Sequence, residues 1–347
     1  MAINHNNIVF FFGAGASAVE GAPIASKLLT EAFKELPNDG RIHKVKEFLE
    51  DFYRNDFSDD TFIPTFEEIL SPIDISLQKQ EQFSDKWDYK KLSELRDDLI
   101  YCICSILHEK LWSRNTHHKN LITQIFNHHP DYYRFSFMSL NYDILLDNAL
   151  LLLADRSGGN YVDIDYGIEF RNEGDDWKSP RERKVFLFKL HGSLNWLFCP
   201  TCNSIKITPK EKGVMRIFTH SEVCEKDRSN QKALIIPPTW QKIYENPYLV
   251  SIWLKAEQIL QKASKVFFIG YSMPDSDVHI KYLLKKSLYR SRGQQPNIIV
   301  VDRNGKDVSS PEYYRYKRLF GSIDYQPIGF ENFATRVNDF ISNSHSK

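Results

Sequence analysis

The sequence predicts an α/β fold, in which a mostly parallel sheet is covered by helices on both faces. Segments of buried-strand character alternate with helical patterns along most of the chain. The first strand, residues 8–12, runs directly into the glycine-rich turn Gly13-Ala14-Gly15, and helix-compatible residues follow at 24–34. Polar side chains stand where several expected strands end. Together these observations indicate a Rossmann-like core, because ligands of open α/β sheets bind at the carboxyl ends of the strands.

The composition fits one large domain or two smaller ones. The chain has 347 residues, of which 42% are hydrophobic and 26% charged, as in ordinary globular proteins. Lys and Arg together number 45, as do Asp and Glu, so the net charge does not indicate nucleic acid or a membrane as a partner. No apolar run approaches the roughly 20 residues that span a bilayer. The five cysteines, an odd number, argue against a disulfide framework. We therefore expect a cytoplasmic protein.

The expected elements follow from hydrophobic periodicity and from breaks at glycine and proline. The strands are expected at residues 8–12, 134–140, 185–190, 233–236, 266–269 and 297–301, with 324–327 as a last edge strand, and with 205–208 and 214–219 as possible short strands. The helices are expected at residues 24–34, 42–53, 65–77, 89–114, 144–153, 251–263 and 331–341, with a further helix that Asp275 or Ser276 caps and that runs to residue 287.

Two segments interrupt this alternation and suggest modules. The polar, acidic and aromatic segment 38–129 reads as an inserted helical module, in which one face of the 89–114 helix is apolar. Cys102 and Cys104 lie in that helix, and we expect them to pack in the core. Residues 196–230 form a loop-rich excursion that resembles a zinc ribbon. Residues 1–37 and 130–347, with this excursion, would then form the Rossmann-like core.

The turn at Gly13-Ala14-Gly15, with Ser17 and Gly21 behind it, is the first candidate binding element. A strand, a glycine turn and a helix bring bare backbone N–H groups close to a nucleotide pyrophosphate. The third glycine of the dinucleotide fingerprint is not at its usual spacing here. A tight turn with no ligand therefore remains the alternative for these residues.

Similar polar positions recur at the ends of the later strands. They are Asn141 and Asp143, His191 and Gly192, Gly270 and Ser272, and Asp302. Each has an ordinary explanation: helix capping for Asn141 and Asp143, turn chemistry for Ser272 and Asp302, and a structural role for a lone histidine. A strand-end imidazole can also act as a general base near neutral pH. The repetition at successive strand ends favours a bound nucleotide.

The cysteines of the excursion suggest a metal site. Cys199-Pro-Thr-Cys202 has the spacing of a zinc-ribbon knuckle, and Cys224 lies where a second knuckle is expected. His220 precedes Cys224 by four residues, so Cys199, Cys202, His220 and Cys224 could complete a tetrahedral Cys3His site. Such a site would be structural, because no position is left for water. A degenerate ribbon without metal is the alternative.

In this order the motifs resemble those of the sirtuin (SIR2) family. The residues that carry the resemblance are Gly13-Ala14-Gly15-Ala16-Ser17, Gly21-Ala22-Pro23, Asn141-x-Asp143, His191-Gly192, Cys199-x2-Cys202, Gly270-Tyr271-Ser272 and Val301-Asp302. Three features depart from the family pattern: Ile24-Ala25-Ser26 replaces Asp-Phe-Arg, Leu140 replaces the Gln before the Asn, and the second cysteine pair is reduced to Cys224. With the helical insertion, these departures make the chain most similar to the bacterial SIR2-like proteins of antiphage defence.

The resemblance implies an NAD glycohydrolase, which cleaves NAD to ADP-ribose and nicotinamide and depletes NAD on infection. In the implied catalytic roles, Asn141 positions water and the nicotinamide ribose, and His191 acts as base. The implied binding residues are Asp143 for the carboxamide, Gly13, Ala14, Gly15, Ser17, Gly270 and Ser272 around the pyrophosphate, and Asp302 for the adenosine ribose. Such an enzyme must be held silent, so a homo-oligomer or a separate partner such as an ATPase is expected to regulate it. The alternatives are an NAD-dependent protein-lysine deacylase and a non-catalytic sensor of an ADP-ribose-type ligand.

Overall fold

A parallel sheet forms the centre of the computed structural model, which describes residues 7–53, 63–111, 114–156, 163–170, 184–208, 223–236, 246–289, 295–303 and 308–342. Within these residues the sheet has seven strands in the order β10-β9-β8-β1-β2-β4-β3, and all neighbours are parallel. The strands are β1 (Asn7–Phe12), β2 (Phe135–Ser139), β3 (Asp163–Asp165), β4 (Lys184–Lys189), β8 (Ala263–Ile269), β9 (Asn297–Val301) and β10 (Asp324–Gln326). Without β3, this is the strand order of a Rossmann fold, so the predicted fold class is confirmed.

The central strands are buried on both faces, which explains their continuous apolar sequences. In β1, the residues from Val9 to Phe12 are at most 1% exposed. The Phe10 ring stacks on Phe267 of β8 with centroids 4.8 Å apart and on Phe137 of β2 at 5.6 Å. The strand register places these three residues directly opposite one another. The aromatic row therefore ties the three central strands together below the glycine turn.

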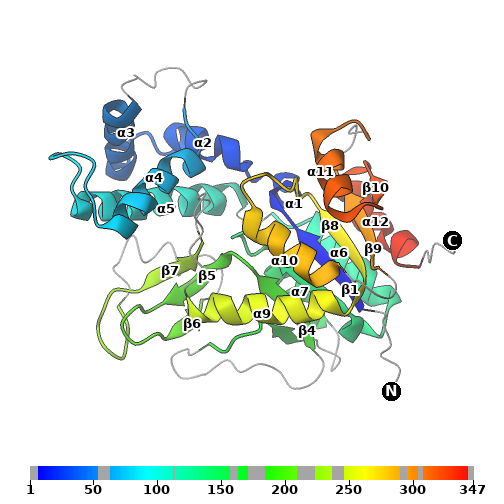
Figure 1. Ribbon diagram of the computed structural model, residues 1–347. Helices are drawn as coiled ribbons and strands as arrows, with labels where there is room; N and C mark the ends of the chain where they lie inside the picture. Colours follow the sequence, from blue (N-terminus) through cyan, green and yellow to red (C-terminus); the bar gives the residue numbers. More distant parts are fainter. Residues whose placement is uncertain are drawn as a thin grey trace.

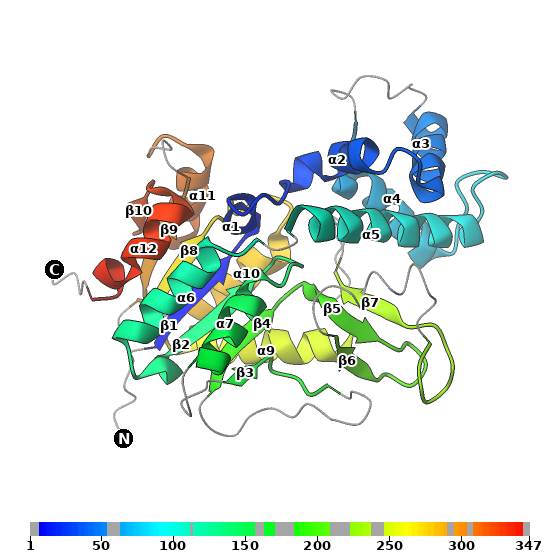
Figure 2. The same cartoon turned by 180° about the vertical axis from the view of Figure 1, so that it is seen from behind.

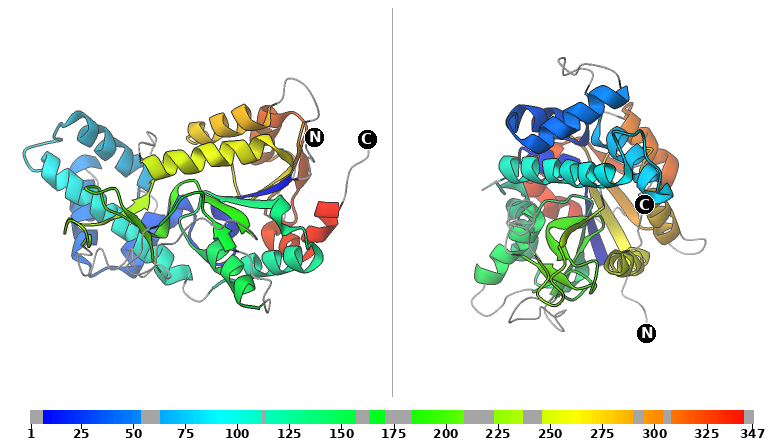
Figure 3. Two further views of the ribbon diagram at one scale, coloured as in Figure 1. Left: turned by 90° about the horizontal axis from the view of Figure 1, so that it is seen from below. Right: turned by 90° about the vertical axis from the view of Figure 1, so that its left-hand side faces the viewer.

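Helices cover both faces of the sheet (Figures 1, 2 and 3). One face carries α9 (Pro247–Gln261) and α10 (Val278–Leu288), which contact each other. The opposite face carries α6 (His117–His128), α7 (Leu145–Arg156) and α12 (Gly329–Ser342), with α6 packed between the other two. The 3-layer arrangement is plainest in the left view of Figure 3, which looks along the sheet. Because both faces are covered, a ligand can reach the sheet only at the ends of its strands.

A separate group of helices lies beyond the carboxyl end of β1 (Figures 1 and 2). It contains α2 (Leu28–Glu35), α3 (Gly40–Tyr53), α4 (Phe66–Lys79) and α5 (Tyr89–Leu111), and α5 contacts the other three. Their buried side chains form a hydrophobic cluster distinct from that of the main sheet. Cys102 and Cys104 are buried there as predicted, and burial raises the pKa of the Cys104 thiol to about 12. The boundaries 38 and 129 stay a prediction. In the structure α2 packs with these helices, and α6 packs on the main sheet.

A small antiparallel sheet connects the two parts. It consists of β6 (Ile205–Ile207), β5 (Gly192–Phe198) and β7 (Lys232–Ile235), in that order. Leu194 and Leu197 of β5 and Ile235 of β7 belong to the hydrophobic cluster of the helical group, whereas Trp196 belongs to the core of the main sheet. The neighbouring side chains of Trp196 and Leu197 therefore pack against different cores, as alternation along a strand predicts. Leu194 does not follow this alternation, and the pairing of β5 with β7 shifts register between Gly192 and Leu197.

Within the described residues, five helices and strands were not expected from the sequence: α1 (Ala14–Ala18), β3, β5, α6 and α11 (Pro311–Phe320). The possible strand at 214–219 lies outside the described residues. Strand β3 has only three residues, and β5 begins directly after the His191-Gly192 turn, where the sequence analysis looked for a site instead. Local periodicity could not separate β5 from the end of β4.

Candidate functional site

The strand ends with polar residues lie next to one another in the sheet. Strands β9, β8, β1, β2 and β4 are neighbours and parallel, so their carboxyl ends meet along one edge. After β1 the chain continues to β2 on one side of the sheet, and after β8 it continues to β9 on the other side. The border between β1 and β8 is therefore the topological switch point. Open α/β sheets bind their ligands at this point. The glycine turn after β1 and Gly270 after β8 flank it.

The glycines of these two turns are required by close packing. The Gly15 N–H donates to the Gly270 carbonyl at 2.8 Å, and the Gly13 N–H donates to the Ile269 carbonyl at 3.0 Å. Gly270 has a φ of +60°, and a Cβ there would lie 2.3 Å from the backbone nitrogen of Ala16. A Cβ on Gly13 would meet the Tyr271 Cα at 2.6 Å. The two turns are therefore built as one unit at the switch point, and Ala14 is its exposed residue.

Ser17, Asn141 and Asp143 form a hydrogen-bonded group beside this unit. Ser17 follows β1 in the short helix α1 (Ala14–Ala18), while Asn141 and Asp143 lie between β2 and α7. The Ser17 hydroxyl donates to Asp143 Oδ2 at 2.6 Å, and Asn141 Nδ2 donates to Ser17 Oγ at 2.8 Å. Because Asn141 Nδ2 also donates to the Gly13 carbonyl at 3.0 Å, the orientation of its amide is fixed. The side-chain oxygen of Asn141, Oδ1, is then the atom that can accept a hydrogen bond from a ligand.

Asp143 combines this contact with a helix-capping role. Its Oδ1 accepts from the backbone N–H of Leu145, the first residue of α7, at 3.1 Å. The side chain is buried, and so is that of Ser17. Asp143 therefore both caps α7 and belongs to the hydrogen-bonded group after β2. Asn141 is only half-buried, which makes it the member of the group that reaches the surface of the edge.

His191 lies at the junction of the main and small sheets. Its carbonyl accepts from the Ile236 N–H at 2.8 Å, and its ring lies 6.4 Å from that of Tyr142. Gly192 has a φ of +79°, and a Cβ there would come within 2.0 Å of the Leu234 carbonyl oxygen. Gly192 therefore allows β7 to pair closely with the start of β5. The histidine is 6% exposed, beside the strand that carries Asn141.

Ser272 and Asp302 belong to the other half of the edge. Ser272 is exposed, and its carbonyl accepts from Arg315 Nη1 at 2.9 Å. Asp302 Oδ2 accepts from the Tyr325 hydroxyl at 2.7 Å, and Oδ1 accepts from the N–H of Arg303 at 2.7 Å. Burial and the neighbouring Asp302 carboxylate raise the pKa of Tyr325. Hydrogen bonds between the paired glycine turns, together with the bond from Asn141 to Gly13, connect this half to Asn141.

Glu20 is a buried residue that the sequence analysis missed. It follows the glycine turn and reaches the start of α6, where its carboxylate accepts from the N–H groups of Thr116 at 3.0 Å and His117 at 2.6 Å. It also lies 3.3 Å from His118 Nδ1. Burial alone would raise the pKa of Glu20, but the hydrogen bonds from His118 and these N–H groups lower it to about 2. The carboxylate thus caps α6 and fixes the chain that leaves α1.

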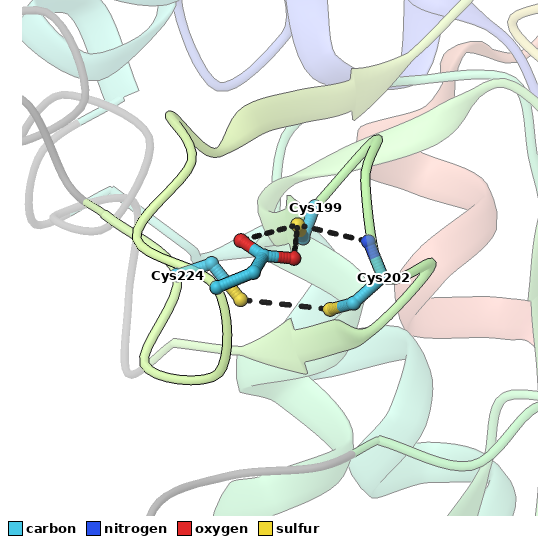
Figure 4. Close-up of side chains that lie close together, drawn as sticks. Cys199, Cys202 and Cys224 are labelled. Atoms are coloured by element: carbon cyan, nitrogen blue, oxygen red, sulfur yellow. Dashed lines mark hydrogen bonds between the residues drawn. The ribbon is translucent and has the colours of Figure 1, made fainter.

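The cysteines converge on one point, as Figure 4 shows for Cys199, Cys202 and Cys224. Cys199 and Cys202 come from the β5–β6 loop and Cys224 from the turn before β7. Cys202 Sγ and Cys224 Sγ are 3.5 Å apart, and with the Asp227 carboxylate all four ligand atoms lie within 4.8 Å of one another. His220 lies outside the described residues.

The two turns that carry these ligands have the same backbone structure. The Cys199 N–H donates to the Ser204 carbonyl, and the Cys199 carbonyl accepts from Asn203, whose φ is +56°. The second turn repeats both bonds, from Cys224 to the Ser229 carbonyl and from the N–H of Arg228, whose φ is +63°. Asp227 thus stands in the second turn where Cys202 stands in the first. The spacing Cys224-x2-Asp227, which is visible in the sequence, could have revealed this fourth ligand.

The donor set fits a tetrahedral metal site. Thiolates and carboxylates are both zinc ligands, and a metal–ligand bond of about 2.0–2.3 Å puts tetrahedral ligands roughly 3.3–3.8 Å apart. Cys199 Sγ lies 3.4 and 3.6 Å from the Asp227 carboxylate oxygens. The group is therefore compact enough for one ion.

Comparisons with known proteins point to one family. A family model described as "SIR2-like domain" matches residues 136–320. Among solved structures, a Sir2 homologue in complex with ADP-ribose is similar at 13% identity, with 96% of this chain and 91% of that chain covered and a TM-score of 0.49. A Sir2 structure on mechanism and regulation aligns over 97% and 92% at 13% identity, with a TM-score of 0.47. No curated protein matches the sequence. No described helix has the length and hydropathy of a membrane span.

Proposed function

The chain belongs to the SIR2-like domain family, since the family model covers more than half of its 347 residues, and on that premise we propose that it is an NAD glycohydrolase. The observation that carries the proposal is the fixed amide of Asn141, which follows β2 at the switch-point edge, next to the strand β4 that His191 follows. The products would be ADP-ribose and nicotinamide. We further propose that the protein acts in the cytoplasm.

Cleavage of the bond between nicotinamide and ribose requires orientation more than covalent help. The transition state resembles an oxocarbenium ion, so the protein must place the water and stabilise developing positive charge. The side-chain oxygen of Asn141 is oriented by the bonds of its amide nitrogen to Gly13 and Ser17. It can accept a hydrogen bond from the attacking water or from a ribose hydroxyl. His191 would take up the proton as general base.

The remaining site residues are proposed to bind the substrate. Ala14, Gly15 and the backbone of Gly13 and Gly270 form the turn unit that would face the pyrophosphate, with exposed Ser272 beside it. Asp302 would accept the adenosine ribose hydroxyls, in competition with its present contact to Tyr325. Asp143 would contact the carboxamide, while its bond to Ser17 gives the serine a positioning role as well.

Product analysis separates hydrolysis from deacylation. Purified protein is incubated with NAD, alone and with an acetyl-lysine peptide, and nicotinamide, ADP-ribose and acyl-ADP-ribose are quantified. The proposal predicts equal amounts of nicotinamide and ADP-ribose without the peptide. Nicotinamide release only with the peptide, in proportion to its deacylation, would show a deacylase. Tight binding of ADP-ribose with no turnover would favour a sensor.

We also propose that Cys199, Cys202, Cys224 and Asp227 hold a structural zinc ion in place of the Cys3His set expected from the sequence. The equivalence of the two turns and the compact donor group support it. A bound ion would fix the β5–β6 loop to the segment before β7. It would take no part in NAD cleavage, since its ligands leave no open position.

The cellular role proposed here is that of an antiphage effector, a toxic NAD hydrolase held silent by self-assembly or by a partner such as an ATPase. Its support is the sequence resemblance, including the absent Asp-Phe-Arg and the helical segment after the first turn. The test is the NAD content of phage-infected cells that carry the wild-type gene or Asn141→Ala. The role predicts a fall in NAD with the wild type only, and equal NAD content in both strains would contradict it.

A further inference from the structure

Lys189 is a buried charged residue at the end of β4, two positions before His191. Its side chain is 1% exposed. Its ammonium group donates to the backbone carbonyl of Asp143 and lies 3.3 Å from Asp147 Oδ2 in the first turn of α7. Because burying an ammonium group is unfavourable unless it is paired and hydrogen-bonded, a lysine at this position requires a reason.

The partner of Lys189 is itself held from the other side. Asp147 is 1% exposed, and its Oδ1 accepts from the Tyr166 hydroxyl at 2.9 Å. Tyr166 is fixed in the core by edge-to-face contacts with Phe170 and Trp196. Burial, together with Asp147, raises the pKa of Tyr166 well above its ordinary value, so the phenol stays a donor. Asp147, the counter-ion of Lys189, is therefore held in place by the Tyr166 hydroxyl.

The contact of Lys189 leads directly to the candidate site. The carbonyl that it binds belongs to Asp143, whose carboxylate accepts from Ser17, and Ser17 Oγ accepts from the Asn141 amide. The turn from Asn141 to Asp143 is therefore held by its side chains from the β1 side and by its backbone from the β4 side. The Lys189 contact thus adds a backbone restraint on this turn to the side-chain bonds that orient the Asn141 amide.

We propose that Lys189 is a positioning residue: its ammonium group, paired with Asp147, fixes the Asp143 carbonyl and so holds the turn that places Asn141. The inference rests on the proposed NAD cleavage for its kinetic readout. A small displacement of a positioned group is enough to lower kcat about 10²-fold. The proposed pyrophosphate and adenosine-ribose contacts lie on other turns, so KM for NAD should rise less than kcat falls.

Three variants separate positioning from plain stability. Lys189→Met removes the ammonium group and leaves Asp147 buried without its cation. Lys189→Met with Asp147→Asn also removes that unpaired charge and keeps the contact to Tyr166. Lys265→Met is the matched control, because Lys265 is buried and its Nζ donates to the carbonyls of Phe340 and Ile341 at 2.7 and 2.9 Å. It lies near the amino end of β8, away from the site.

The proposal predicts that the double variant regains unfolding free energy relative to Lys189→Met and keeps the roughly 100-fold loss in kcat. Lys265→Met should lose stability and retain wild-type kcat. Wild-type kcat in the double variant would overturn the proposal, because the ion pair would then be only structural. If Lys189→Met alone does not fold, the double variant decides the question.

Hydrogen exchange keeps the inference separate from the proposed reaction. The Leu145 N–H donates to Asp143 Oδ1, so its exchange reports on the turn. Faster exchange at Leu145 in the double variant, with the core strands unchanged, supports the positioning role even if wild-type protein does not cleave NAD. In that case the proposed NAD cleavage is contradicted, and the positioning role of Lys189 stands. Unchanged exchange at Leu145 would overturn the inference whether or not NAD is cleaved.

Discussion

At the scale of single residues, the Ser17 hydroxyl joins two strands of the candidate site. It donates to Asp143 and accepts from Asn141, so both of its bonding directions are used inside the protein. A serine in the glycine turn was expected to face the pyrophosphate, and the structure also gives it a hydrogen bond with Asn141. The amide of Asn141 is oriented by this serine and by the Gly13 carbonyl together.

Substitution of Ser17 by Ala should therefore affect catalysis and stability together. The buried Asp143 oxygen loses its donor, which should lower the free energy of unfolding by about 1–3 kcal/mol. A freed Asn141 amide should lower kcat by about 10²-fold. Urea unfolding and NAD turnover measure the two effects. Ser264→Ala is the control, since Ser264 makes a comparable bond to the Asn7 carbonyl at the amino end of the strands. Equal kcat in both variants would contradict the role.

Glu20 gives a prediction of pH dependence. Its pKa is lowered from 4.5 to about 2 in the folded protein, so its stabilising effect is present above pH 4.5 and is lost as the pH falls towards 2. The difference in unfolding free energy between wild type and Glu20→Gln should be constant near neutral pH and shrink below pH 4.5. Urea unfolding at several pH values tests this. A difference that stays constant down to pH 3 would contradict the low pKa.

At the scale of elements, the two glycine turns act as one structural unit. Gly270 combines a positive φ with backbone atoms of Gly15 and Ala16 within 3 Å of a Cβ, so neither its conformation nor its space suits another residue. The sequence analysis assigned these glycines to contact with a phosphate. The structure shows that packing of one turn on the other already requires glycine, and that this packing builds the switch-point edge.

Gly270→Ala should destabilise the protein by about 3 kcal/mol, from backbone strain and from the clash with Ala16. Gly321→Ala is a matched control. Gly321 also has a positive φ, +77°, but nothing lies within 4 Å of its Cβ position. With a ψ of −74° it lies outside the left-handed helical region, so its substitution should lower stability through backbone strain without an added clash. Urea unfolding of both variants measures the difference, and equal losses would show that the contact between the turns does not constrain Gly270.

The paired turns of the small sheet give a prediction of metal content. Protein purified without chelator should contain about one zinc per chain, and Asp227→Ala should lose most of it. Glu225→Ala removes an exposed carboxylate two residues away and should keep the metal. Metal analysis by mass spectrometry decides between the ligand sets. Zinc retained in Asp227→Ala and lost in His220→Ala would restore the Cys3His assignment, and no zinc in wild type would indicate a degenerate ribbon.

At the scale of the whole molecule, the positions of the central strands in the sequence were predictable because each is a continuous apolar run that ends at a polar or glycine turn. Those same runs located Asn141, His191 and Asp302 at one edge. Long-range contacts were not predictable: nothing local pairs Lys189 with Asp147, or Glu20 with the start of α6. Helix α6 was missed because its apolar residues, such as Leu121 and Ile125, are few among histidines and asparagines.

The most direct test of the central claim is nicotinamide release from NAD by purified wild-type protein, Asn141→Ala and Asn332→Ala. Asn332 is an exposed asparagine of α12 and serves as the matched control. The account predicts release of nicotinamide with equal ADP-ribose by wild type and the control, and loss of release in Asn141→Ala with its folding intact. Turnover by Asn141→Ala at the wild-type rate would contradict it.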